Sequence, residues 1–294
     1  MTGTSAPAPI IVDVLSGDAP AVVDATKPLL YADDLGAVRG DGVFETLLVR
    51  DGHTCNTRRH EDRFLNSAEM LQLPAPDLGR WRAAADLALR EWGRPDDASM
   101  RWVYTRGRET SGLPTGYIMI TPVTAGAAAA RETGVRVMLA ERGFSLDLGS
   151  RAPWALIGAK TLSYAANMAA LRHAREHGFD DVIFTSAEGK LLEGPTSTII
   201  VVRDGVLHTP NPGEGVLPGT TQAALFDLAA ERGIECRPDV LTPEDLRTAD
   251  AVWLVSSVRI AVRVVSVDGA DLASVPAEDE DRFIALCEEA LAAR

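Results

Sequence analysis

Strand-like segments joined by hairpin turns, with helical segments between them, are the feature that most limits the folds open to this chain. The apolar residues 43–49 lead into Asp51-Gly52, a dipeptide typical of a two-residue hairpin turn. Residues 100–105 and 117–122 form a second pair of strand-like segments around a loop. Strands that pair with their sequence neighbours and are interleaved with helices predict an α+β (mixed α/β) fold rather than a doubly wound parallel sheet.

The other elements follow from periodicity. Apolar residues recur every three or four positions from His60 onward, which predicts a helix there. Further helices are predicted over 78–92, 161–177, 220–232 and 279–293, and strands over 135–140, 181–185, 198–203, 206–209 and 252–256.

Residues 124–133 are mostly small and lack an apolar face, so they are predicted to be an interdomain linker. They divide a smaller N-terminal α/β domain, 1–123, from a larger C-terminal domain, 134–294. Hydrophobic residues make up 46% of the 294 residues, which is enough to bury a core in each of two domains.

Charge and composition exclude several partners. The 29 basic and 42 acidic residues give a net charge of −13, which argues against nucleic acid or an anionic membrane but not against an anionic small molecule. No apolar run approaches the roughly 20 residues that span a bilayer, and residues 1–9 predict no signal peptide. The cysteines Cys55, Cys236 and Cys287 show no metal-ligand spacing, so no metal is expected and a reduced cytoplasm is the simplest setting.

Lysine occurs only three times, which narrows any lysine-dependent chemistry to three candidates. Lys160 follows the apolar residues 154–159 and is predicted to open a helix, with Tyr164 four residues later on the same face. Partial burial would lower the pKa of the Lys160 amine and make it a better nucleophile toward a carbonyl. The alternative is a lysine that extends into solvent, as Lys27 before a proline and Lys190 in a hairpin turn are expected to do.

Glu193 follows Leu191-Leu192, and a carboxylate in such an apolar setting needs a partner. A pyridinium nitrogen would be suitable, and the alternative is a turn glutamate that faces solvent.

Three segments favour phosphate binding. Residues 217–221, Leu217-Pro218-Gly219-Thr220-Thr221, form a loop entering a helix, where backbone N–H groups and hydroxyls bind anions. Ser256-Ser257 ends a strand and offers two more hydroxyls. Arg63 in His60-x-x-Arg63 is placed near a helix start and suits bidentate contact with phosphate. The alternatives are an ordinary helix cap and a surface ion pair.

The order of these motifs along the chain resembles that of the class IV aminotransferases, the pyridoxal 5′-phosphate (PLP) enzymes of fold type IV. The resemblance runs from about residue 30 to residue 268. It implies a two-domain fold like that of D-amino acid aminotransferase, PLP at the domain interface, and a homodimer that acts on a small-molecule amine.

The resemblance also implies roles. Lys160 would form the Schiff base with PLP and carry the proton, Tyr164 would lie near the ring hydroxyl, and Glu193 would pair with the ring nitrogen. Leu217 would pack on the ring face. The phosphate-binding residues would be Arg63, Gly219, Thr220, Thr221, Ser256 and Ser257.

Residues 40–46 and 160–168 look most like the aminodeoxychorismate lyase-like branch of the family. Branched-chain enzymes usually have Phe-Glu-Gly where this chain has Phe44-Glu45-Thr46, and D-amino acid enzymes have an Arg-x-His clamp that is not found in residues 106–116. Phe44, Thr46 and Arg106 are the candidate substrate residues.

Three functions are therefore compared. The first is a 4-amino-4-deoxychorismate lyase of folate biosynthesis, which releases pyruvate to give 4-aminobenzoate. The alternative is an aminotransferase for D-amino acids or branched-chain amino acids, using the same lysine. The third is a PLP-binding or scaffold protein without turnover, which the joint presence of the lysine, tyrosine, glutamate and arginine opposes.

Overall fold

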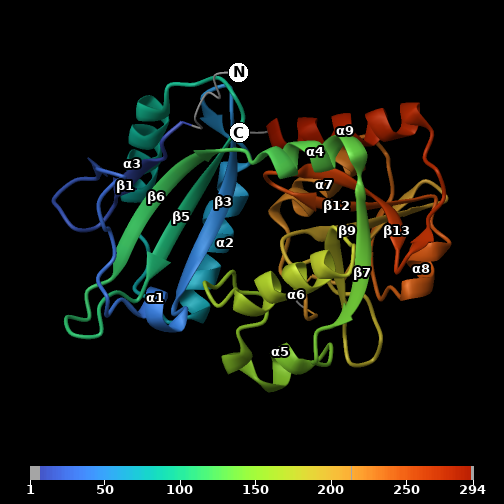
Figure 1. Cartoon of the computed structure of the whole chain (residues 1–294), viewed down its shortest axis with the longest axis horizontal. Coiled ribbons are helices and arrows are strands. Elements are labelled where there is room, and N and C mark those ends of the chain that lie inside the picture. The colour runs from blue at the N-terminus through green and yellow to red at the C-terminus, as the bar shows by residue number, and fades with distance from the viewer. Residues whose placement is uncertain (1–6, 213, 293–294) are drawn as a thin grey trace. The chain divides into compact units, whose positions relative to one another are not determined.

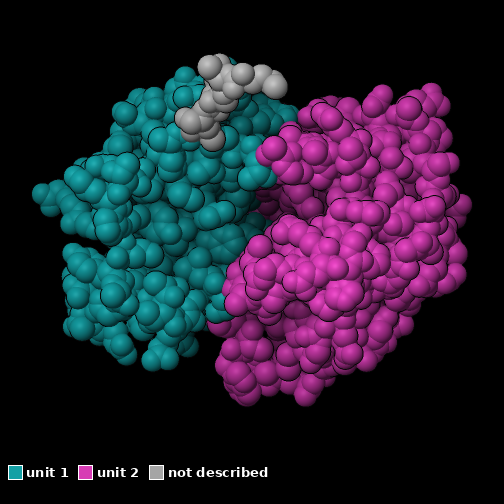
Figure 2. All heavy atoms as spheres, in the orientation of Figure 1, with its two compact units in different colours: residues 1–124, 159–163, 294 teal, residues 125–158, 164–293 magenta. Residues whose placement is uncertain are grey.

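The computed structural model describes residues 7–212 and 214–292 and contains two compact units (Figure 1). Unit 1 takes the chain up to Thr124 together with Ala159–Ser163, and unit 2 takes Ala125–Gly158 and the chain from Tyr164 to Ala293 (Figure 2). The domain division expected from the sequence was contiguous. In the structure, residues 159–163 leave unit 2 and belong to unit 1.

Unit 1 is built on a six-stranded antiparallel sheet with the order β2-β1-β6-β5-β3-β4. Its strands are β1 Ile10–Asp13, β2 Ala21–Val23, β3 Gly42–Arg50, β4 His53–Thr54, β5 Ala98–Thr105 and β6 Thr115–Pro122. The predicted hairpin at Asp51-Gly52 is confirmed, because both residues have positive φ, 52° and 75°, as a type I′ turn requires. The predicted pairing of β5 with β6 is also confirmed.

Helices α1 (Leu35–Arg39), α2 (Thr57–Met70) and α3 (Leu78–Trp92) belong to the same unit. The Asp77 carboxylate accepts hydrogen bonds from the backbone N–H groups of Gly79 and Arg80 and so caps α3. Helix α2 starts three residues before His60, so Arg63 lies in the middle of the helix and not at its start, as the motif had suggested. The prediction missed this start because Asn56, in the left-handed region, makes no side-chain cap.

Unit 2 is built on a mixed sheet of eight strands, in the order β11-β10-β9-β12-β13-β7-β8, with β14 paired to β13. The central pairs are antiparallel, whereas β13-β7, β7-β8 and β10-β11 are parallel. The strands are β7 Val135–Glu141, β8 Asp181–Thr185, β9 Thr198–Arg203, β10 Val206–Pro210, β11 Cys236–Asp239, β12 Ala251–Ser256, β13 Ile260–Val267 and β14 Ala270–Asp271. The α+β class predicted from the hairpin pattern is therefore confirmed.

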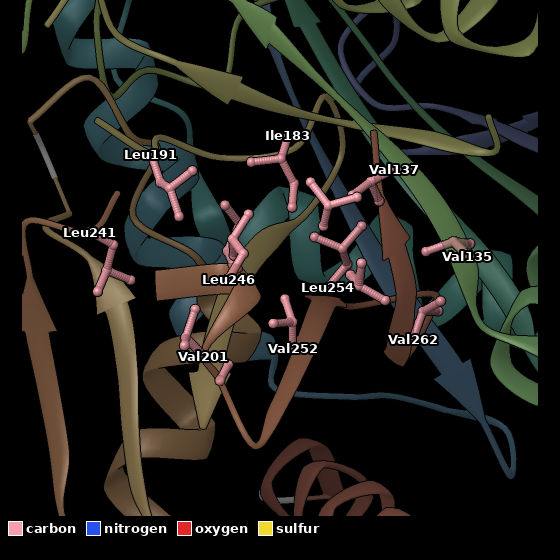
Figure 3. Close-up of a cluster of buried hydrophobic side chains, with 14 residues drawn as sticks. Val135, Val137, Ile183, Leu191, Val201, Leu241, Leu246, Val252, Leu254 and Val262 are labelled. Carbon is pink, nitrogen blue, oxygen red and sulfur yellow. The ribbon is translucent and has the colours of Figure 1, made fainter. Parts of the chain in front are cut away.

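The core of unit 2 is aliphatic and lies against this sheet (Figure 3). Val137, Ile199, Leu246, Leu254 and Val262 in this cluster have no exposed surface. Four of them come from strands far apart in the sequence, which the sheet order brings together, and Leu246 comes from helix α8 (Pro243–Arg247).

The long helices of unit 2 are α4 (Ala125–Thr133), α6 (Ala165–Glu176), α7 (Thr220–Glu231) and α9 (Ala277–Ala292). Between them lie the short helices α5 (Leu148–Arg151) and α8 (Pro243–Arg247) and a 3₁₀ turn, Pro153–Ala155. Most of the segment expected to be a linker is helix α4. Ala130 packs against the aliphatic core, and Arg131 donates a hydrogen bond to the carbonyl of Val258. Small residues with high helix propensity explain this outcome. Among the described residues, no helix has the length and apolar character needed to cross a membrane.

The helix predicted over 161–177 begins only at Ala165. Residues 160–162 instead run beside β3: Phe44 N–H donates to Lys160 O (3.0 Å), and Leu162 N–H donates to Gly42 O (2.8 Å). Lys160 therefore does not open a helix and does not share a helical face with Tyr164. Pairing with a strand satisfies these backbone groups, which outweighs the local helix pattern.

We expect Phe64→Ala to lower the free energy of unfolding by about 3–5 kcal/mol. Phe64 is fully buried, and its ring lies 4.9 Å from that of Trp81 and 5.7 Å from that of Trp102. Urea unfolding would measure the loss. Met70→Ala on the same helix is the control: Met70 is 40% exposed, and its change should be within about 0.5 kcal/mol. Equal effects of the two variants would contradict this account of the core.

Candidate active site

Lys160 is held at three points within unit 1. Its backbone N–H donates to Ser67 Oγ (3.0 Å), and its carbonyl accepts from Phe44 N–H. Its Nζ lies 4.6 Å from the centre of the Phe44 ring, within the range of a cation–π contact. The lysine is half-buried, as predicted, and its backbone leaves the side chain few orientations.

The alternation of β3 separates its side chains into two groups. Glu45 is fully buried, whereas Phe44 and Thr46 lie on the opposite face and are half-buried. Of the three predicted substrate residues, Phe44 and Thr46 thus share the strand face that Lys160 contacts.

Arg106, the third candidate, is bound within unit 1. Its Nε donates to Asp41 (2.7 Å), and its Nη2 donates to Asp41 (3.2 Å) and to the carbonyl of Leu71 (2.6 Å). Through these contacts Arg106 connects the end of α2 with the loop before β3. A substrate role for Arg106 stays a prediction.

Glu45 forms a buried ion cluster with two residues of α2. Its carboxylate accepts from Arg63 Nε (2.7 Å), Arg63 Nη2 (2.7 Å) and His60 Nδ1 (2.6 Å). Burial alone would raise the pKa of Glu45, but the Arg63 guanidinium and His60 lower it to about 2. Burial lowers the pKa of His60, so its ring is neutral near pH 7, with the proton on Nδ1 because a carboxylate only accepts.

Unit 2 brings Glu193 and Leu217 together. The Leu217 N–H donates to Glu193 Oε2 (3.1 Å), and Arg142 Nη1 lies 3.8 Å from Glu193 Oε1. Arg142 lies over the Phe184 ring, 4.5 Å from its centre. A partner for this carboxylate was expected from the sequence, but the arginine was missed because it lies 51 residues earlier.

Three of the predicted phosphate-binding hydroxyls converge in unit 2. Thr220 Oγ1 and Thr221 Oγ1 each lie 3.5 Å from Ser257 Oγ, and all three residues are buried. The antiparallel register explains this: Val255 near the end of β12 pairs with Thr198 at the start of β9. Gly219 packs on the same Thr198, so tightly that a Cβ would lie 2.3 Å from its Oγ1.

The outcome for the other predicted residues of unit 2 is mixed. Ser256 is half-buried, and its Oγ accepts from Arg259 N–H (3.3 Å) in the turn after β12, which is a structural contact. Tyr164 lies before α6, and its hydroxyl donates to Pro195 O (2.6 Å). Asn167, which received no role from the sequence, donates to the same carbonyl (2.8 Å). The four-residue spacing of Lys160 and Tyr164 therefore does not reflect a shared helix.

Each unit, taken by itself, offers donors that suit a group of PLP. Unit 1 offers an amine at a fixed backbone position, beside an aromatic ring. Unit 2 offers a carboxylate for a ring nitrogen, and separately three hydroxyls at the start of the 12-residue helix α7, where backbone N–H groups favour an anion. The described residues contain no cluster of histidine, cysteine or carboxylate side chains able to hold a metal ion.

We expect acid to destabilise the protein in two steps, because both shifted pKa values lie below their ordinary ones. Unfolded His60 takes a proton below its ordinary pKa of 6.5 while the folded ring resists, so stability falls as the pH drops below 6.5. Glu45 adds a loss from pH 4.5 down to about 2. His60→Gln should reduce the loss of stability as the pH falls below 6.5, as measured by urea midpoints. His53→Gln, at an exposed site, is the control; an unchanged slope in His60→Gln would contradict the assignment.

Comparison with known proteins identifies the family. The model of the family "Amino-transferase class IV" matches residues 42–267. A bifunctional aminodeoxychorismate lyase / D-amino acid transaminase from Mycobacterium tuberculosis is 47% identical over 264 residues, which covers 87% of this chain and 91% of the relative. A hypothetical aminotransferase from Mycobacterium tuberculosis, solved in a PLP-bound form, is 44% identical with a TM-score of 0.92, and the match covers 96% of this chain and 98% of that one. A fold IV transaminase from Curtobacterium pusillum is 38% identical with a TM-score of 0.90 and the same coverage. The resemblance predicted from the motifs is thereby confirmed: the chain belongs to the class IV aminotransferases.

Proposed function

We propose that this chain is a PLP-dependent 4-amino-4-deoxychorismate lyase. The observation that carries the PLP chemistry is the position of Lys160, whose backbone is bound on both sides by β3 and Ser67. The lyase assignment is supported by the relative from Mycobacterium tuberculosis, named as both a lyase and a D-amino acid transaminase. The motif at residues 40–46, which differs from that of branched-chain enzymes, supports it as well.

The proposed roles are those that the family resemblance implies, and the contacts described above support them. When bound, PLP supplies an electron sink for the bond cleaved at the substrate. Lys160 Nζ takes the proton from the carbon that carries the substrate amine and returns a proton as pyruvate leaves. Glu193 keeps the ring nitrogen protonated. The hydroxyls of Thr220, Thr221 and Ser257 and the guanidinium of Arg63 bind the phosphate.

The lyase reaction needs no second substrate. 4-Amino-4-deoxychorismate and the sum of 4-aminobenzoate and pyruvate have the same atoms, so no oxidant, reductant or amino acceptor is consumed. Aromatisation of the ring favours the products. A transaminase, in contrast, must bind a keto acid in every cycle, and the same Lys160 would move the proton from one carbon to another.

The second candidate is an aminotransferase for D-amino acids or branched-chain amino acids. The bifunctional name of the relative and the fold IV transaminase favour it as a second activity of the same site. A D-alanine aminotransferase from Staphylococcus haemolyticus is 25% identical over 84% of this chain. The proposal also includes a homodimer, which the sequence resemblance implies, and a cytoplasmic setting, which the three widely spaced cysteines favour.

Two assays separate the candidates. Pyruvate release from 4-amino-4-deoxychorismate, without any keto acid, tests the lyase. Formation of a keto acid from D-alanine or leucine in the presence of 2-oxoglutarate tests the transaminase. Pyruvate release that depends on added keto acid, or none at all, would reject the lyase assignment.

Lys160→Ala should abolish turnover and the adduct that borohydride traps between protein and PLP. Lys27 is exposed and paired with Asp24, and Lys190 follows a surface turn and is half-buried, with its backbone bound to Ser186. We expect neither to replace Lys160. Peptide mass spectrometry after reduction would locate the adduct. Lys190→Ala is the matched control and should retain it. PLP trapped on Lys27 or Lys190 would contradict the assignment.

Glu193→Gln should keep the fold and reduce kcat by roughly tenfold or more, which is about 1.4 kcal/mol. The amide oxygen can still accept from Leu217 N–H, but the charge that pairs with the ring nitrogen is lost. Steady-state kinetics with saturating PLP would measure the change. Glu188→Gln, at an exposed turn position, is the control. Wild-type rates in Glu193→Gln with bound PLP would show that the carboxylate serves elsewhere.

A further inference from the structure

The buried carboxylate of Glu45 is not used by the proposed chemistry. It has no exposed surface, and its two oxygens accept three hydrogen bonds of 2.6–2.7 Å from His60 and Arg63. Charged groups are rarely buried this completely without a purpose beyond stability, since a hydrophobic replacement is often at least as stable. The geometry of the cluster indicates that Glu45 sets the orientation of the Arg63 guanidinium.

Arginine has two edges that each bind an oxyanion through a pair of N–H groups. Glu45 binds the edge formed by Nε and Nη2 of Arg63. The edge formed by Nη1 and Nη2 therefore lies outside this ion pair. Because the guanidinium is planar, a carboxylate bound to one edge sets the plane and direction of the other.

We propose that Glu45 is a positioning residue that holds the guanidinium of Arg63 so that its second edge binds the cofactor phosphate, with His60 holding Glu45 in turn. This inference rests on the proposed function, because it assumes that Arg63 binds the phosphate. It gives Glu45 of β3 and His60 of α2 an indirect part in phosphate binding, although neither residue touches the phosphate.

Charge alone would give the opposite effect. Glu45 neutralises Arg63, and His60 is neutral near pH 7, so these three residues bring almost no net charge toward an anion; Lys160 is the other cation near His60. If only the electrostatic potential at the phosphate mattered, removal of the Glu45 charge would strengthen phosphate binding. If orientation matters more, its removal weakens binding. The sign of the change therefore distinguishes the two roles.

Glu45→Gln breaks the arrangement with the smallest change in shape. A glutamine has one oxygen where Glu45 uses two. If that oxygen faces Arg63 Nε, the amide NH₂ opposes both His60 Nδ1–H and Arg63 Nη2–H. If it faces His60, the NH₂ opposes Arg63 Nε–H. In both orientations the bidentate contact is lost and the guanidinium can rotate.

The test compares two ligands on the apo-enzyme, PLP and pyridoxal, which lacks the phosphate. Glu45→Gln should weaken PLP binding by about tenfold and leave pyridoxal binding unchanged. In an Arg63→Gln background, adding Glu45→Gln should cause no further loss of PLP affinity, because both changes remove the same contact. Absorbance titration measures each dissociation constant.

Controls separate a positioning role from general damage. Glu61→Gln is the matched control, since Glu61 is also buried on α2 and forms a bidentate pair with Arg82 (2.7 Å for each bond). It should leave both affinities unchanged. Glu45→Asp keeps the charge but is one methylene shorter, so it should also lose PLP affinity selectively. It answers the same question if Glu45→Gln does not fold.

Several results would overturn the inference. Tighter PLP binding in Glu45→Gln would show that Glu45 acts through its charge. Equal losses for PLP and pyridoxal, or additive losses with Arg63→Gln, would show a structural role only. If the wild type forms no borohydride-reducible adduct on Lys160, the proposed function itself fails. If the adduct forms and Glu45→Gln binds PLP like the wild type, only the role of Glu45 is rejected.

Discussion

The pairing of residues 160–162 with strand β3 is the constraint on which the Lys160 site depends. Phe44 N–H and Leu162 N–H each donate across this pairing, and the Lys160 N–H donates to Ser67 Oγ, so the backbone on either side of the lysine is fixed. Gly42 makes the close approach possible, since a Cβ there would lie 2.8 Å from Cδ1 of Leu162. A lysine on such a segment loses less conformational entropy when it binds a ligand than one at the exposed start of a helix.

Strand β3 serves two purposes because its side chains alternate. The face with Phe44 and Thr46 meets the Lys160 side chain, and the opposite face places Glu45 beneath α2. Spacing of three and four residues along α2 puts His60, Arg63 and Ser67 toward β3 and the lysine segment. Burial of the Glu45 charge is costly, and three short hydrogen bonds offset that cost.

In unit 2, the order and register of the strands bring the candidate phosphate-binding residues together. Ser257 and Thr220 are 37 residues apart, yet they meet because β12 ends where β9 begins and α7 starts beside the same point. Glu193 lies on the segment before β9, where the backbone of Leu217 binds its carboxylate. Within each unit, backbone pairing thus brings the candidate residues together.

The sequence by itself determined the family resemblance, the candidate site residues and the elements that are strongly periodic. The hairpin at Asp51-Gly52 and helix α3 with its Asp77 cap could be predicted, because each depends on contacts within a few residues. Only the tertiary structure decided that Lys160 lies on a strand-like segment, that residues 125–133 form a packed helix, and that Glu45 binds Arg63. These outcomes depend on partners 18 to 127 residues away, which a local sequence pattern does not reveal.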